Sequence, residues 1–241
     1  MRAIVLAVLL AASVALPAAA QQKQKPAAQP APAAQAAPAA EGESLPEMDK
    51  LMAYVGTPEY FKALSTVVLG GEHDITPECK DAKALGRAGL TVLKLPGFRD
   101  GATVPATGLW KDQIEVDRCG PHVLHNVLVE GTPSGVRVNL LMPGLTGAPW
   151  DWQVDILQSA AEQAMKASGC KDASKVVIYD TQEDKMLEEI KADERGRMIS
   201  GKWRETWTLK ACGKLQPVSV TFTADGKGRA TWESQAAAKK K

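Results

Sequence analysis

The residues in this chain that are best suited to do chemistry are a carboxylate and the two tryptophans around it, in the run Trp203-Arg204-Glu205-Thr206-Trp207. The run has the composition of a strand, in which alternate residues share a face, so Trp203, Glu205 and Trp207 point the same way. On a dry face, a carboxylate must be paired or hydrogen-bonded, or its pKa rises. Glu205 is therefore a candidate general acid or ligand acceptor, or else a structural acid. We expect its row to face helices, with Glu205 buried against a cation, a hydroxyl or a backbone donor.

A second aromatic group lies where a helix is predicted to begin. Trp150 and Trp152 follow the turn-forming segment 143–147. They could form the rim of an aromatic cleft over the sheet, or they could serve packing alone. The candidate ligand-binding residues are therefore Trp150, Trp152, Trp203, Glu205 and Trp207.

The histidines do not form a metal site by their spacing. His122 and His125 lie in a predicted strand, where a separation of three residues directs them to opposite faces. The chain also lacks a nucleophile elbow, a phosphate-binding loop and a complete calcium loop. No metal, cofactor or assembled catalytic set is predicted. The alternative that remains is a small secreted hydrolase or lyase that uses Glu205 with a histidine such as His125.

The N-terminus has the pattern of an export signal. Arg2 precedes an apolar run over residues 3–16, which is followed by Pro17 and three alanines. The run is shorter than the roughly 20 residues that a membrane-spanning helix needs. We predict a signal peptide over residues 1–20, a periplasmic or secreted mature chain, and no transmembrane segment after cleavage.

Residues 21–43 consist almost wholly of Ala, Pro and Gln, which predicts a disordered linker. The formal net charge is +1 and charges of both signs alternate along the chain, whereas a nucleic-acid-binding protein would show a clustered basic face. No nucleic-acid partner is therefore predicted. Residues 235–241 form a Lys-rich tail, which we expect to be a solvated terminus.

Four widely spaced cysteines without a C-x-x-C pair indicate structural disulfides in an exported chain. Three pairings are possible. We favour Cys119 with Cys212, because each opens a Cys-Gly step next to predicted strands, which leaves Cys79 with Cys170. A bridge that closes a loop of about 90 residues would contribute roughly 4 to 5 kcal/mol to stability.

Capping patterns and periodicity predict the order of elements. Three short helices begin near residues 44, 57 and 76, and later helices cover residues 149–169 and 181–190. The predicted strands cover residues 91–95, 108–116, 122–130, 136–142, 176–179, 201–211, 216–223 and 229–233. A strong Asp-Gly turn joins the last two strands.

These elements predict an α+β fold, with a twisted antiparallel sheet that ends in a β-meander and helices packed mainly on one face. Residues 44–234 suit a single globular domain, because no second linker or repeat divides them. The function that fits best is a non-enzymatic, disulfide-stabilised envelope protein that binds another envelope protein or a small ligand. The oligomeric state is not indicated.

Overall fold

The computed structural model describes residues 46–192, 198–227 and 229–237. The predicted signal peptide and linker lie outside these residues. Within them the fold is α+β, as predicted, with three α-helices and eight strands. The strands form two antiparallel sheets of four strands each, and not the one sheet that the sequence suggested.

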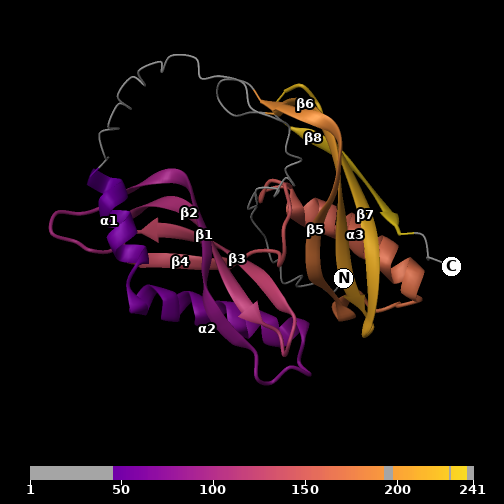
Figure 1. Cartoon of the computed structure of the whole chain (residues 1–241), viewed down its shortest axis with the longest axis horizontal. Helices are drawn as coiled ribbons and strands as arrows, with labels where there is room; N and C mark the ends of the chain where they lie inside the picture. Colours follow the sequence, from indigo (N-terminus) through magenta and orange to yellow (C-terminus); the bar gives the residue numbers. More distant parts are fainter. Residues whose placement is uncertain (1–45, 193–197, 228, 238–241) are drawn as a thin grey trace, which may run out of the picture.

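The first half, residues 46–140, begins with two helices, α1 (Pro46–Val55) and α2 (Pro58–Ile75). Thr57 caps α2 by accepting a hydrogen bond from the Tyr60 backbone N–H, and Pro58 occupies the first helical position. Four strands follow in sheet order: β1 (Lys83–Gly97), β2 (Thr107–Asp117), β3 (His122–Thr132) and β4 (Gly135–Leu140). Both helices pack against this sheet (Figure 1).

The second half, residues 153–237, begins with α3 (Gln153–Ser168), which ends at Gly169 in the left-handed conformation. A short 3-10 turn, η1 (Ala173–Lys175), leads into the second sheet. Its strands, in sheet order, are β5 (Val176–Ala192), β6 (Met198–Ala211), β7 (Lys214–Ala224) and β8 (Ala230–Ala236). Helix α3 packs mainly on β6, β7 and β8 (Figure 1).

Each half has its own hydrophobic core, because alternate strand residues face the helices of that half. In the first half the core joins the two helices to β2 and β3, through residues such as Leu51, Leu64, Trp110 and Val127. In the second half it joins α3 to β6 and β7, through residues such as Ile156, Trp207 and Phe222. No helix in the described ranges combines the length and the apolar character needed to cross a membrane.

The two halves repeat one plan. In each, a helix is followed by a cysteine, and the turn between the second and third strands of the meander carries a Cys-Gly step. Residues 108–120 align without a gap on residues 201–213. The matched pairs are Gly108 with Gly201, Trp110 with Trp203, Asp112 with Glu205, and Cys119-Gly120 with Cys212-Gly213. Gly108 and Gly201 also share a positive φ, of 116° and 128°. This repeat corrects the expectation that no repeat divides residues 44–234.

Both disulfides lie within a half, so the predicted pairing is wrong. Cys79 is bonded to Cys119 with Cα atoms 5.8 Å apart, and Cys170 to Cys212 with Cα atoms 5.6 Å apart. The resemblance between the two Cys-Gly steps is real, but it marks equivalent turns of a repeat. Each bridge joins the end of a helix to the middle turn of its own sheet.

Two predicted helices are also wrong. Residues 181–190 belong to β5, which is paired with β6, and Thr76 is the C-cap of α2 and starts no helix. In both places the first strand of the sheet, β1 or β5, is longer than predicted and includes residues for which local patterns predict a helix. Both strands contain several bulges, which break the alternation that identifies a strand.

Candidate binding site

The tryptophan and glutamate row of β6 lies on the inner face of the second sheet. Trp203, Trp207 and Leu209 belong to the second core, and Glu205 between them is 0% exposed. The prediction that this row is buried and faces a helix is confirmed. Trp203 also stacks on Phe222 of β7, with ring centroids 4.7 Å apart.

Glu205 accepts hydrogen bonds on both carboxylate oxygens. Oε1 accepts from the Gly147 backbone N–H at 2.8 Å and from Trp203 Nε1 at 2.9 Å. Oε2 accepts from Trp207 Nε1 at 2.8 Å and from the Thr146 hydroxyl. All four donors are neutral, and two of them come from the segment that leads into α3. Glu205 therefore holds this segment, residues 141–152, against β6.

Burial raises the pKa of Glu205 above its ordinary value, although the hydrogen bonds from Thr146, Trp207, Trp203 and Gly147 oppose the rise. A raised pKa is one property of a general acid. A general acid must also reach the atom it protonates, and Glu205 has no exposed surface. Its geometry thus fits a positioning role better than a catalytic one.

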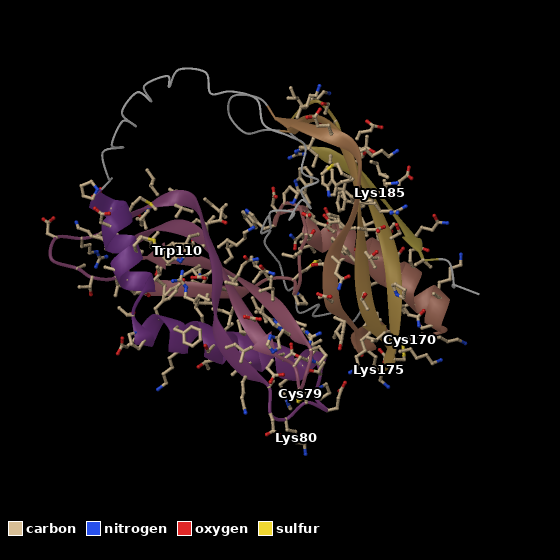
Figure 2. All side chains as sticks on the ribbon, viewed as in Figure 1. Cys79, Lys80, Trp110, Cys170, Lys175 and Lys185 are labelled. Atoms are coloured by element: carbon tan, nitrogen blue, oxygen red, sulfur yellow. A yellow bond between two sulfur atoms is a disulfide. The ribbon has the colours of Figure 1, made fainter. Side chains whose placement is uncertain are left out.

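A pocket of about 280 Å³ opens beside this row, between β5, β6 and Gly147. Its apolar lining comes from Met186, Ile190 and Trp203. Its charged lining has both signs and includes Lys185 and an ion pair between Arg204 and Asp184 at 2.5 Å. Figure 2 shows that Lys185 lies toward one end of this sheet, whereas Cys170 and Lys175 lie toward the other.

Apolar side chains continue outward from the pocket along the hairpin of β5 and β6. Met186 is 56% exposed, and Leu187, Ile190 and Ile199 are also exposed. Exposed apolar groups that cluster at one place mark interaction sites more often than scattered ones do. The volume of the pocket lies just below the roughly 300 to 1,000 Å³ that is typical of small-molecule sites.

The other two candidate tryptophans lie just before α3. Trp152 is the residue at the N-cap of α3 and packs against the second core, whereas Trp150 is exposed. Neither lines the pocket. The structure therefore brings Trp203, Glu205 and Trp207 together, and leaves Trp150 and Trp152 outside the pocket, just before α3.

The structure does not bring Glu205 and His125 together. His125 is a buried residue of β3, and its Nε2 lies 2.6 Å from Glu72 Oε2 on α2. Its Nδ1 has no hydrogen-bond partner among the described residues. The two groups that the enzyme alternative requires therefore contact different partners in different halves.

Glu72 is the centre of a buried polar cluster that sequence reasoning missed. Arg118 donates to both of its oxygens, from Nε at 2.6 Å and from the second terminal nitrogen at 2.8 Å, and Thr76 donates as well. Burial alone would raise the pKa of Glu72, but the hydrogen bonds from His125, Arg118 and Thr76 outweigh it and lower the pKa to about 2.

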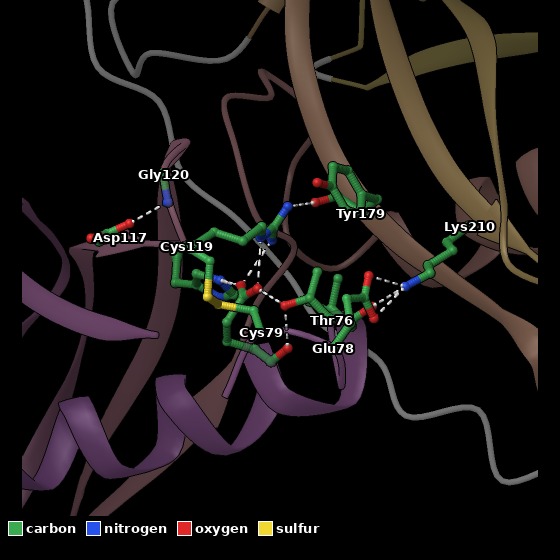
Figure 3. Close-up of polar contacts among 12 residues, drawn as sticks. Thr76, Glu78, Cys79, Asp117, Cys119, Gly120, Tyr179 and Lys210 are labelled. Carbon is green, nitrogen blue, oxygen red and sulfur yellow. Dashed lines mark hydrogen bonds and ion pairs between the residues drawn. A yellow bond between two sulfur atoms is a disulfide. The ribbon is translucent and has the colours of Figure 1, made fainter. Parts of the chain in front are cut away.

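The same arginine links the two halves. Its Nη1 donates to the Tyr179 carbonyl of β5 at 3.0 Å, a hydrogen bond drawn in Figure 3. The guanidinium carbon of Arg118 also lies 4.3 Å from the centre of the Tyr179 ring. Lys210 of β6 reaches back to Glu78 at 2.7 Å, which is also visible in Figure 3. Polar contacts thus join the sheets near the first disulfide. Arg118 stands immediately before the Cys-Gly step, and this position was the only sequence signal that could have pointed to it.

No group of three or more potential metal ligands is gathered within the part of the chain that the structure describes. Comparison with known proteins yields no match at a significant level, whether to a protein-family model, to a curated protein or to a solved structure. The site must therefore be interpreted from its own geometry.

Proposed function

We propose that this protein is an exported, disulfide-stabilised module that binds a partner at the pocket between β5 and β6 and performs no covalent chemistry. The observation that carries the proposal is the pocket itself, which places exposed apolar groups of Met186 and Ile190 beside Trp203, whose indole is hydrogen-bonded to Glu205. The mature chain begins after residue 20 and works in the periplasm or outside the cell. Two disulfides among four cysteines support that location.

The arrangement around Trp203 supports a binding role. Glu205 holds the indole nitrogen of Trp203 and, through Gly147, the opposite wall of the pocket. A recognition site needs side chains whose positions are fixed in advance, since ordering them on binding would cost free energy. The buried carboxylate supplies this order while remaining inaccessible to a substrate.

An apolar fluorescent probe, anilinonaphthalene sulfonate, tests the proposal on the mature chain from residue 21 onward. We expect saturable binding, which Met186→Glu weakens at least tenfold because it places a charge in the apolar part of the site. Met52→Glu is the matched control, because Met52 is 53% exposed on α1 and Met186 is 56% exposed. This control should bind the probe like the unmodified protein.

Fluorescence titration of the three proteins decides the matter. An equal loss in both variants would show that the probe senses general surface hydrophobicity. The absence of saturable binding to the unmodified protein would remove the pocket as a binding site.

A further inference from the structure

The repeat gives each residue of the second half a counterpart in the first. Trp110 of β2 corresponds to Trp203 of β6, and each follows a glycine of positive φ. Trp110 is paired with Val92 of β1, and Trp203 with Met186 of β5. A bulge begins directly after each paired residue, after Val92 and after Met186. Val92 and Met186 therefore occupy the same place in the two halves.

These two equivalent places differ in what covers them. Val92 is partly buried and packs on the first core, to which α1 contributes Leu51 and Val55. Met186 is 56% exposed. The glycines of positive φ give a second equivalent pair, because Gly108 closely approaches Pro96 of β1 and Gly201 closely approaches Ile190 of β5. Here too the residue of the first half, Pro96, is buried and that of the second, Ile190, is exposed.

The difference follows from the helices. The first sheet carries two helices, and α1 lies against β1. The second sheet carries α3, and the segment before it, residues 143–152, forms no α-helix. The described part of the second half thus contains no counterpart of α1. The pocket, with its apolar lining of Met186, Ile190 and Trp203, lies where such a helix would pack, and we call this place the seat.

We propose that this seat receives an amphipathic α-helix of a partner protein, which would lie on β5 as α1 lies on β1. This inference rests on the proposed function, because it names the partner of the same pocket. Two apolar residues spaced by four positions would face Met186 and Ile190, as Leu51 and Val55 of α1 face the first core.

The rim of the seat determines the rest of the partner's chemistry. Glu183 of β5 stands where the first half has Leu90, since each is paired with the buried acid of the neighbouring strand. Lys185 and the ion pair between Arg204 and Asp184 lie next to it. The bound helix therefore has a narrow apolar stripe flanked by polar residues, and is not apolar all round.

A synthetic peptide with the sequence of residues 44–57, blocked at both ends and labelled with fluorescein, is the probe. It carries the helix that occupies the equivalent seat. We expect fluorescence anisotropy to show saturable binding to the mature protein, weakened at least tenfold by Met186→Glu in the protein and unchanged by Met52→Glu. Within the peptide, Leu51→Glu should weaken binding to a similar degree, because Leu51 is part of the apolar stripe.

A peptide with Met52→Pro separates a helix from an extended segment, since proline breaks a helix interior and leaves Leu51 and Val55 in place. Undiminished binding of this peptide would overturn the helix in favour of an extended segment. Failure of the unmodified peptide while the fluorescent dye still binds at Met186 would overturn the helix and leave the pocket in place. Failure of both probes would overturn the proposed function as well. A protein dimer that Met186→Glu dissociates would identify the occupant as a second copy of this chain.

Discussion

One buried acid in each half connects the second strand of the sheet to the chain that packs on it. Asp112 connects β2 to α2, and Glu205 connects β6 to the segment before α3. Asp112 and Glu205 occupy equivalent positions and are both fully buried. Asp112 accepts a hydrogen bond from Tyr60 of α2 and forms an ion pair with Arg87 at 2.8 Å. Glu205 has only neutral donors. The same structural task is thus performed with a cation in one half and without one in the other.

Replacement of Glu205 by alanine should destabilise the protein strongly, because it leaves two indole N–H groups and a backbone N–H without an acceptor. Each unsatisfied buried donor costs about 1 to 3 kcal/mol, so we expect the loss of three partners to lower the free energy of unfolding by at least about 3 kcal/mol. Glu183→Ala is the matched control, because Glu183 is paired with Glu205 across the strands but is exposed. Urea unfolding at neutral pH measures both, and equal losses would contradict a buried structural role.

The sign of the pH dependence at Glu205 follows from its raised pKa. In the pH range between the ordinary pKa of glutamate and the higher pKa in the folded state, the folded protein binds more protons than the unfolded one. Glu205 therefore makes stability decrease as pH rises through that range. Glu205→Gln should lose this contribution. Urea unfolding at several pH values measures the free energy of unfolding of both proteins, and a difference between them that does not change with pH would contradict the raised pKa.

At the scale of elements, sequence patterns identified the regular strands and missed the bulged ones. Strands β2 and β3 pair without a register shift, as do β6 and β7, and the predicted bounds of these four strands lie close to the observed ones. Strand β5 contains the run 181–190, rich in Glu, Lys, Met and Leu, which favours a helix locally. Its pairing with β6 overrides that preference, and pairing between strands is not visible in a local window.

The candidate site shows the same limit. The sequence identified Trp203, Glu205 and Trp207 and the face on which they lie. The pocket itself depends on Met186 and Ile190 of β5, and the sequence pattern wrongly predicts a helix for these residues. The other wall comes from Gly147, which only tertiary contact brings to Glu205.

Each disulfide connects a helix end to the middle turn of its sheet and closes a similar loop. The sequence separations are 40 and 42 residues, for which the chain-entropy model gives about 4 kcal/mol each. Replacement of Cys79 and Cys119 by alanine should therefore destabilise the protein about as much as replacement of Cys170 and Cys212. Urea unfolding of the two double variants measures this, and non-reducing peptide mapping checks the pairing. A peptide that joins Cys119 to Cys212 would contradict the structure.

At the scale of the whole molecule, the same helix-and-meander plan occurs twice, and the two copies differ in whether a helix covers the first strand of the sheet. The first half is closed by α1, and the second half has an uncovered seat at Met186 in the described residues. The repeat is hard to detect in the sequence because only residues 108–120 and 201–213 match closely, and the remaining residues share a plan but few identities. The buried contacts of Arg118 hold the two halves together near the first disulfide.

The most direct test of a binding seat at Met186 is NMR of the mature protein with ¹³C-labelled methionine methyl groups. Met186 and Met52 are almost equally exposed, and Met142 is fully buried, so the chain supplies its own controls. On titration with anilinonaphthalene sulfonate, the Met186 methyl signal should shift in a saturable manner while the signals of Met52 and Met142 stay in place. Equal shifts of Met52 and Met186, or no shift of Met186 at saturation, would contradict the binding seat.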